Sequence, residues 1–176
     1  GRAVLEGGSD EQKRDVLPAI ISGERLVSFA LSEASARPNA ATVKSTARVD
    51  GTGYVLNGSK HFVEFAEQAE QILVVARTSD SEDPEYGLTM FLLDAKAAGI
   101  HYETLRIMAL QPQAKVTLDN VRVEASSVVG EVDQAWSVLN PVLQAATAIL
   151  CGYMTGLAER ALDMAINYSQ ERIQYG

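Results

Sequence analysis

The residue types that most often carry metal or thiol chemistry are few in this chain and lie far apart. His61 and His101 are the two histidines, and Cys151 is the single cysteine. Their spacing does not match a zinc site, so we predict no metal centre. A lone cysteine cannot form an internal disulfide, which is typical of proteins in a reducing compartment. We therefore predict a cytoplasmic location.

A second chemical feature closes the sequence. A long apolar helix leads into Glu171 and Arg172, and an aromatic–glycine pair, Tyr175-Gly176, follows. The simplest role of Arg172 is to complement the negative end of the helix dipole. The chain stops directly after this motif, and residues 1–9 begin without a methionine. We therefore expect the chain to be a piece of a larger protein.

Length and charge limit the classes of function. The 176 residues can bury one good core, and 15 basic against 23 acidic residues give a net charge of -8. Nucleic-acid binding and attraction to an anionic membrane surface both need clustered basic residues. The charge balance therefore argues against both kinds of partner.

The first element that could position functional groups is a helix. Ser9 and Gln12 have the spacing of a capping box, in which each side chain bonds the backbone N–H of the other residue. Pro18 is expected to bend this helix or to end it early, and Gly23 to close it.

From Glu24 the apolar residues alternate, which indicates strands. Asp50-Gly51 and Asn57-Gly58 are both typical hairpin-turn dipeptides. The run from Ile72 to Ala76 is continuously apolar, which predicts a strand buried on both faces. We predict about eight short strands, over residues 27–32, 44–49, 54–56, 72–76, 88–93, 100–105, 115–118 and 121–123. Such a series is typical of a β-barrel or β-sandwich.

Helical periodicity returns after Gly130. A short helix is predicted over residues 133–139, and Asn140-Pro141 has the pattern of a new helix start. The next helix would run to about Arg172, a length of roughly 48 Å. No charge occurs between Pro141 and Ala158, but the polar residues among them argue against a membrane span. We expect this helix to be buried among other helices.

The fold class is therefore α+β, with a middle β-barrel or sandwich domain flanked by helices. The predicted boundaries are 1–23 for the end of a helical domain, 24–131 for the β-domain and 132–176 for the start of a second helical domain.

The order of these elements and their motifs resembles the acyl-CoA dehydrogenase family. The resemblance covers nearly the whole chain and includes Gly8–Lys13, Leu17-Pro18, Ser22–Glu24, Asp50–Lys60, Gly87–Leu93, Leu118–Val123, Ala161–Asp163 and Arg172–Gly176. It implies a three-domain subunit that binds FAD and oxidises the α and β carbons of an acyl-CoA thioester. In the family a carboxylate removes the α proton and the flavin accepts the β hydride. An active member would pass its electrons to an electron-transfer flavoprotein.

The resemblance places the family's first flavin-binding segment at residues 29–38. Phe29 and Leu31 match its aromatic and aliphatic positions, and the hydroxyl of Ser32 replaces that of a threonine. The family's Gly-Ser, which approaches the flavin and the thioester, is replaced by Arg37-Pro38. These two residues are the candidate substrate contacts, and the alternative is a solvated loop.

The second flavin-binding segment follows Lys60. Phe62 matches an aromatic residue that stacks on the flavin. Glu64 falls where the family has a threonine or serine hydrogen-bonded to flavin N5. A carboxylate there would oppose the negative charge that the flavin gains on reduction.

The third segment, at the end of the long helix, matches the family motif Arg-x-x-aromatic-Gly. The resemblance implies that Arg172 and Tyr175 reach the FAD of a neighbouring subunit across a dimer interface. A guanidinium group suits the pyrophosphate because it can bind two oxygens at once.

No residue of the chain is identified as the catalytic base. Some branches of the family place that carboxylate near the start of the long helix, where this sequence has Gln144, Ala146 and Thr147. Two hypotheses remain open. The chain belongs either to an FAD-dependent acyl-CoA dehydrogenase, or to a non-catalytic or half-site subunit that lends Arg172 and Tyr175 to a partner's FAD. Both imply a homo- or hetero-oligomer formed through the C-terminal helical domain. A third hypothesis, an isolated β-barrel that binds a ligand, does not explain the uncharged helix.

Overall fold

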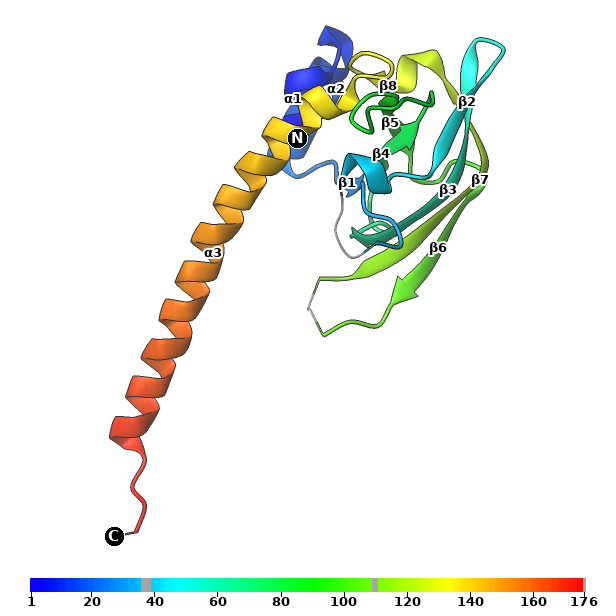
Figure 1. Cartoon of the computed structure of the whole chain (residues 1–176). Helices are drawn as coiled ribbons and strands as arrows, with labels where there is room; N and C mark the ends of the chain where they lie inside the picture. Colours follow the sequence, from blue (N-terminus) through cyan, green and yellow to red (C-terminus); the bar gives the residue numbers. More distant parts are fainter. Residues whose placement is uncertain (36–38, 109–110, 176) are drawn as a thin grey trace. The chain divides into compact units, whose positions relative to one another are not determined.

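The computed structural model describes residues 1–35, 39–108 and 111–175, so the candidate substrate contacts Arg37 and Pro38 lie outside the described residues. The chain divides into two units, Gly1–Leu139 and Asn140–Gly176. The first unit holds the sheet and the helices before it (Figure 1). The second unit is most of one long helix. The predicted domain boundaries at 23/24 and 131/132 remain predictions.

Two helices precede the sheet, α1 (Arg2–Gly7), which was not predicted, and α2 (Asp10–Ser22). The capping box of α2 is confirmed: the N–H of Ser9 donates to Gln12 Oε1 over 3.0 Å, and the N–H of Gln12 donates to Ser9 Oγ over 3.2 Å. Gly23 ends α2 with a left-handed φ of 79°. Pro18 does not end the helix early, because α2 continues past it to Ser22.

Eight strands form one mixed sheet, whose order is β6-β7-β3-β2-β4-β5-β8, with β1 paired in parallel to β4. Their bounds are Val27–Ala30 (β1), Thr46–Asp50 (β2), Gly53–Glu64 (β3), Gln71–Arg77 (β4), Leu88–Asp94 (β5), Ile100–Leu105 (β6), Gln113–Glu124 (β7) and Val128–Val129 (β8). Two 3₁₀ turns, η1 (Ala40–Thr42) and η2 (Ala125–Ser127), lie between strands.

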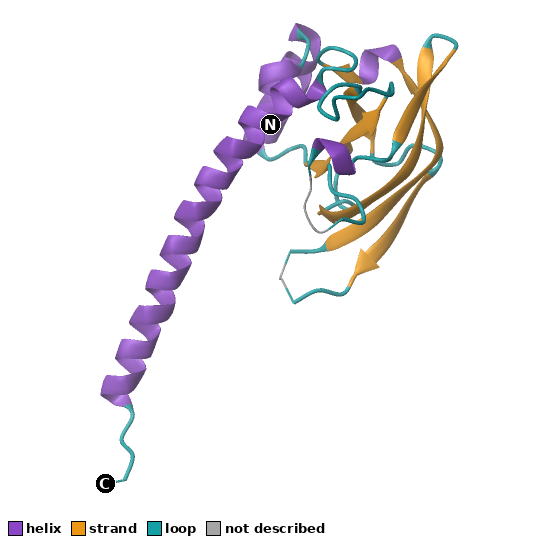
Figure 2. Ribbon diagram, viewed as in Figure 1, coloured by secondary structure: helices purple, strands orange, loops and turns teal. Residues whose placement is uncertain are grey.

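The α+β class with flanking helices is confirmed, but a closed barrel is wrong. The sheet order ends at β6 on one side and at β8 on the other, and the described residues contain no pairing between these two strands. Figure 2 shows the resulting open sheet. The sheet has two sections, β6-β7-β3-β2 and β4-β5-β8, which are joined where β2 pairs with β4 through one residue pair, Thr46 and Arg77.

The hairpin predicted at Asp50-Gly51 is confirmed, since Asp50 pairs with Gly53 at the start of the antiparallel β2–β3 ladder. The hairpin predicted at Asn57-Gly58 is wrong, because β3 continues through both residues with a register shift between Leu56 and Gly58. Gly58 has a φ of 145°, and a Cβ atom there would lie 2.7 Å from the Cα of Ser45. The glycine therefore permits a close approach of two backbone segments rather than a turn.

Two other predicted strands also merge, since residues 115–118 and 121–123 both belong to β7. This long strand pairs antiparallel with β3 along its length. Asn120 lies between the two predicted pieces with a φ of 52°, which explains why the sequence shows an interruption there.

The core of the first unit is built from buried side chains of several strands, including β3, β4, β5 and β7. Residues Ile72 to Ala76 of β4 are buried, as predicted for a strand covered on both faces. Phe91 of β5 is completely buried and meets the ring of Tyr54 edge-on, with the ring centroids 5.1 Å apart. Apolar burial of this kind is the main stabilising contribution to such a fold.

A single helix, α3 (Ala135–Glu171), replaces the two helices predicted after Gly130. Pro141 lacks the N–H that would bond the carbonyl of Ser137, so it removes one hydrogen bond near the start without ending the helix. The first residues of α3 anchor it in the first unit, where Ala135, Trp136 and Leu139 are buried.

From Asn140 onward the residues of α3 that the structure describes make up the second unit. Its large apolar side chains are exposed within this chain, including Ile149, Leu150, Tyr153, Met154 and Leu157. The helix is long and apolar enough to cross a membrane, by length and composition only. An apolar surface of this extent indicates contacts with further protein or with lipid.

Candidate functional site

The structure brings the first two predicted flavin-binding segments together. The N–H of His61 donates to the carbonyl oxygen of Ser32 over 2.8 Å. The hydroxyl of Ser28 donates to the carbonyl oxygen of Glu64 over 2.7 Å. These two hydrogen bonds join β1 and the residues after it to the last residues of β3. The segment that holds Phe29, Leu31 and Ser32 therefore lies beside the segment that holds Phe62 and Glu64, although the two are far apart in sequence.

Two aromatic rings of this site are open to solvent. The side chain of Phe29 is 39% exposed and that of Phe62 is 57% exposed. Phe62 also has a left-handed backbone with a φ of 57°, which is unusual for a bulky residue. Such strain persists where the surrounding structure imposes it, and it is frequent at binding sites. We refer to Phe29, Ser32, Phe62 and Glu64, which lie on these two adjacent segments, as the aromatic face.

Leu31 and Glu64 differ in what they can offer to a ligand. The side chain of Leu31 is buried, so it packs into the protein. Glu64 is exposed at the end of β3, and its carboxylate accepts a hydrogen bond of 3.4 Å from the amide of Gln113. The aromatic face therefore carries a negative charge, at the position predicted from the sequence.

Beneath the aromatic face lies a buried ion pair that the sequence analysis missed. Lys60 Nζ lies 2.7 Å from Glu33 Oε1, and the lysine is completely buried. Glu33 also accepts hydrogen bonds from the backbone N–H groups of Lys44, over 2.8 Å, and Ser45, over 2.9 Å. Lys60 donates a further bond of 3.3 Å to the carbonyl oxygen of Leu31.

The surroundings of this ion pair act on both ionisable groups. Burial alone would raise the pKa of Glu33, but the charge and hydrogen bond of Lys60 and the two backbone donors lower it below its ordinary value. Burial lowers the pKa of Lys60, and Glu33 offsets this only in part. The only sequence signal was the presence of opposite charges directly after Ser32 and directly before His61.

The third predicted segment belongs to the second unit and is described by itself. The guanidinium of Arg172 lies over the ring of Tyr168, 5.2 Å from its centroid, and the N–H of Arg172 bonds the carbonyl of Tyr168. Tyr175 is fully exposed and has a left-handed φ of 65°. Both predicted side chains are therefore at the end of α3, outside the unit that holds the aromatic face.

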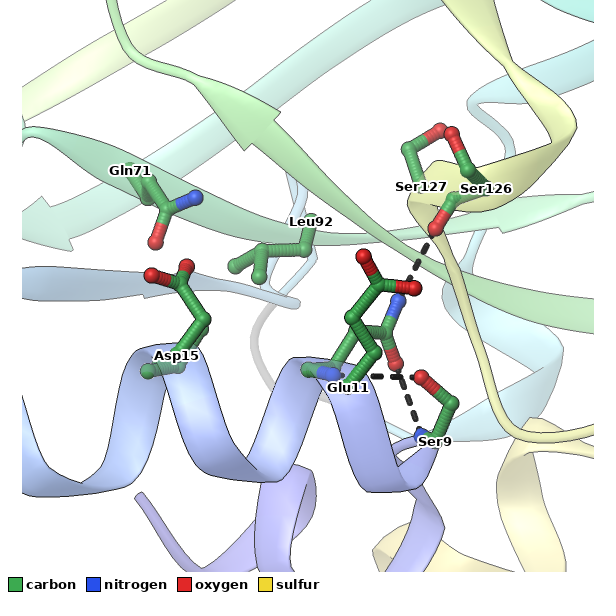
Figure 3. Close-up of a pocket in the computed structure, with 9 residues that line it drawn as sticks. Ser9, Glu11, Asp15, Gln71, Leu92, Ser126 and Ser127 are labelled. Carbon is green, nitrogen blue, oxygen red and sulfur yellow. Dashed lines mark hydrogen bonds between the residues drawn. The ribbon is translucent and has the colours of Figure 1, made fainter.

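A separate pocket of about 330 Å³ lies between α2 and the sheet. Figure 3 shows Glu11 and Asp15 of α2 on one side of it and Gln71 and Leu92 of the sheet on the other. The side chain of Gln12 ties α2 to the carbonyl oxygen of Ser126 over 3.0 Å. None of the residues that line this pocket belongs to the aromatic face, so the pocket is not the predicted flavin site.

Comparison with known proteins identifies the family. The family profile described as "Acyl-CoA dehydrogenase, middle domain" matches residues 28–121, more than half of the chain. The chain belongs to the acyl-CoA dehydrogenase family. The matched region spans β1 to β7 and includes every residue of the aromatic face.

Curated and solved members of the acyl-CoA dehydrogenase family match nearly the whole chain. The 3-(aryl)acrylate reductase of Clostridium sporogenes is 33% identical over 99% of this chain and 47% of its own length. The caffeyl-CoA reductase–Etf complex subunit CarC of Acetobacterium woodii is 31% identical over 100% of this chain and 47% of its own length. The butyryl-CoA dehydrogenase structure from Megasphaera elsdenii has a TM-score of 0.90 and 26% identity, covering 99% of this chain and 46% of that one. The chain thus spans about half the length of these relatives.

Members of the acyl-CoA dehydrogenase family bind FAD, and the aromatic face fits a flavin ring in two respects. Phe29 and Phe62 present exposed aromatic surface on neighbouring segments, which suits stacking against a planar ring. The side chain of Ser32, next to them, is only partly buried and has a hydroxyl that can donate to a ring heteroatom. The carboxylate of Glu64 is the one feature of this face that opposes negative charge on the ring.

Proposed function

We propose that this chain forms the middle part of an FAD-dependent acyl-CoA dehydrogenase that carries out α,β-dehydrogenation of an acyl-CoA thioester. The observation that carries this proposal is the pairing of the two flavin-binding segments through the His61–Ser32 hydrogen bond, together with an exposed aromatic ring on each segment, Phe29 and Phe62. The family match over residues 28–121 supports the same function. Bound FAD would supply the hydride acceptor.

The residues of the chain would bind and orient the cofactor. Phe62 would stack on the flavin ring, Phe29 would cover its edge, and Ser32 would donate a hydrogen bond to it. Arg172 would bind the pyrophosphate of an FAD in a neighbouring subunit with its two-pronged guanidinium group, and Tyr175 would pack beside it. The general base would come from outside these residues, because Gln144, Ala146 and Thr147 offer no carboxylate. Arg37 and Pro38 remain the proposed substrate contacts.

One observation favours a second function, that of a half-site subunit. Glu64 is exposed beside Phe62, and its carboxylate would raise the free energy of a negatively charged flavin ring at this site. A subunit of this kind would bind its own FAD weakly and would lend Arg172 and Tyr175 to the FAD of an active partner.

Two substitutions in the intact protein test the half-site function. Glu64→Thr is the one that distinguishes it, because Arg172 would serve a neighbouring FAD in either case. For a half-site subunit we expect Arg172→Ala to lower the flavin content, because a charged hydrogen bond is worth about 1.5–3 kcal/mol. The fall in affinity would then be about tenfold or more. Glu64→Thr should leave the flavin content unchanged or raise it, since it removes a repulsive charge. Flavin absorbance per subunit after gel filtration measures both effects.

Glu82→Thr provides the matched control for Glu64→Thr, since Glu82 is also exposed but lies in the loop between β4 and β5. This variant should not change the flavin content. If Glu64→Thr instead abolishes flavin absorbance while the protein stays folded, Glu64 is a working ligand and the repulsion argument is wrong.

We also propose that α3 packs within a helical domain that assembles into a dimer or tetramer. Its apolar side chains from Ile149 to Leu157 are exposed in this chain, and monomers rarely tolerate so large an apolar surface. The match of a solved acyl-CoA dehydrogenase structure over 99% of the chain favours protein contacts over a lipid bilayer. Light scattering of the intact protein should give the mass of a dimer or tetramer. A stable monomer at micromolar concentration would contradict this proposal.

The electron acceptor is proposed from a named relative, and the location from the single cysteine. A relative is named as a subunit of a complex with Etf, and we propose an electron-transfer flavoprotein as the redox partner here. Cys151 is an exposed free thiol, which suits the reducing cytoplasm that we propose as the location.

A further inference from the structure

The buried ion pair of Glu33 and Lys60 occupies a particular place relative to the aromatic face. Glu33 directly follows Ser32, and Lys60 directly precedes His61. The hydrogen bond from the His61 N–H to the Ser32 carbonyl, 2.8 Å long, is therefore adjacent to the ion pair on both segments. Any change in the separation of Glu33 and Lys60 would act directly on this bond.

The ion pair also fixes a third segment. Both carboxylate oxygens of Glu33 accept a backbone N–H, from Lys44 and from Ser45. Lys60 Nζ bonds the carbonyl of Leu31 in addition to the carboxylate. The two side chains thus join the residues after β1, the residues before β2, and β3. Through Glu33, the residue at the start of the connection from β1 to β2 is hydrogen-bonded to Lys44 and Ser45 at its end.

Gly58 shows that this region has little space. A Cβ atom at Gly58 would lie 2.6 Å from the Cβ and 2.3 Å from the Oγ of Ser45. Gly58 thus lets β3 approach the segment that Glu33 holds, and Lys60, two residues later, makes the charged contact. The spacing Gly58-x-Lys60 therefore has a physical reason in this structure.

Stability alone is a poor explanation for the ion pair. Taking two charges out of water is costly, and well-packed apolar residues of similar volume are often equally stabilising or more so. A charged pair does, however, impose a distance and direction on its groups that apolar contacts do not. The ion pair is therefore better explained by the arrangement that it imposes on neighbouring residues.

We propose that Glu33 and Lys60 form a positioning clamp that holds Ser32 and Phe62 in the register that the flavin ring requires. This inference rests on the function proposed above for the aromatic face. In this role both are positioning residues: they act through the Ser32–His61 bond and need not touch the cofactor. The clamp exists in the protein without flavin, since its hydrogen bonds lie entirely within the chain.

The double variant Glu33→Gln/Lys60→Met of the intact protein tests the clamp. It removes both charges, so no unpaired buried charge remains to unfold the protein. The two backbone N–H groups bond different carboxylate oxygens of Glu33, and in glutamine one of these positions is an NH2 group, which cannot accept. The introduced amide is therefore expected to keep only one of the two bonds. We expect hydrogen–deuterium exchange at the His61 amide to become about tenfold faster or more, which equals about 1.4 kcal/mol of lost protection. The amide of Val74 in the buried strand β4 should exchange as in the wild type.

The flavin provides a second readout on the same variant. We expect the dissociation constant for FAD to rise about tenfold or more, and the flavin absorbance band to shift because the ring meets Phe62 at a different angle. Arg25→Met is the control, since it removes the ion pair with Asp15, 2.6 Å long, which lies outside the aromatic face. Neither the His61 exchange rate nor the FAD affinity should change in this control.

The outcomes distinguish the clamp from the proposed function. If the wild-type protein binds no FAD, the proposed function fails, but selective exchange at His61 still supports the clamp. If the double variant keeps wild-type exchange at His61 and wild-type FAD affinity, the clamp is wrong. If all amides exchange faster together, the ion pair contributes only to global stability, and the clamp is equally wrong.

Discussion

Replacing Lys60 with methionine should lower the free energy of unfolding by about 3–5 kcal/mol, the typical cost of leaving one partner of a buried ion pair uncompensated. Lys60 is completely buried, and its ammonium lies 2.7 Å from the Glu33 carboxylate. Methionine has a similar length, so the variant removes the charge with little change in packing. Chemical denaturation of the intact protein at neutral pH measures the loss.

The control for this substitution is Arg25→Met. In that ion pair the side chain of Arg25 is 26% exposed and that of Asp15 is 60% exposed. Because such pairs are screened by water, Arg25→Met should cost only about 0–1 kcal/mol. A loss of similar size in the two variants would show that the Glu33–Lys60 contact is not a buried ion pair in solution.

Acidic pH should reduce the difference in unfolding free energy between the wild type and Lys60→Met. In the wild type the pKa of Glu33 lies below its ordinary value, which is about 4.3 in an unfolded chain. The stability that Glu33 contributes is therefore complete above about pH 4.3 and is lost as the pH falls through the pKa of the folded state. In Lys60→Met the backbone N–H groups of Lys44 and Ser45 still lower the pKa of Glu33, but burial, the largest effect, is no longer opposed by a lysine and acts to raise it. Protonation of Glu33 in acid removes the unpaired buried charge of the variant. The difference in unfolding free energy between Lys60→Met and the wild type should therefore shrink as the pH falls.

Several elements could be predicted because their cause is local. The capping box at Ser9 and Gln12, the stop at Gly23 and the Asp50-Gly51 hairpin each depend on a few neighbouring residues. The buried strand Gln71–Arg77 was evident from an uninterrupted apolar run. In these cases the chemistry that forms the element lies within the pattern itself.

Other elements were mispredicted because their cause lies elsewhere in the chain. Asn57-Gly58 has the sequence of a hairpin turn, but a glycine is needed there because Ser45 lies too close to leave room for a side chain. Asn140-Pro141 has the pattern of a helix start, but in the structure both residues lie inside α3. The helix begins before them, at Ala135, where Trp136 and Leu139 are buried. Whether a sheet closes into a barrel depends on its edge strands, and alternation alone does not indicate which strands are edges.

The candidate site shows the same division. Motif resemblance located Phe29, Ser32, Phe62 and Glu64, and the hydrogen bonds from His61 to Ser32 and from Ser28 to Glu64 bring their two segments together. Their role in binding FAD stays a prediction. The Glu33–Lys60 contact joins residues 27 positions apart in sequence, and neither helical nor strand periodicity indicates contacts between residues so far apart. Arg172 lies in the second unit, and its role stays a prediction.

Truncating a buried and an exposed phenylalanine of the first unit should affect stability to very different extents. Phe91 is completely buried and packs edge-on against Tyr54. Phe91→Ala should lower the free energy of unfolding by about 3–5 kcal/mol, because it removes a large buried side chain and leaves a cavity. Phe62 is 57% exposed, so Phe62→Ala should change stability by only about 0.5 kcal/mol. Denaturation curves of the two variants measure this contrast.

For flavin affinity, in contrast to stability, truncation at Phe62 should have a clear effect. If Phe62 stacks on the flavin ring, its removal forfeits an aromatic contact worth about 0.5–1.5 kcal/mol beyond the area that it buries, so FAD should bind about tenfold more weakly. Tyr86→Ala is the control, since Tyr86 is also an exposed aromatic residue, 49% exposed, but lies in the loop before β5. The left-handed backbone of Phe62 lies within the register shift between Lys60 and Val63 in the β3–β7 ladder, and the ring at this irregularity remains exposed. Unchanged FAD affinity in Phe62→Ala, measured on folded protein, would remove the aromatic face from the proposed flavin site.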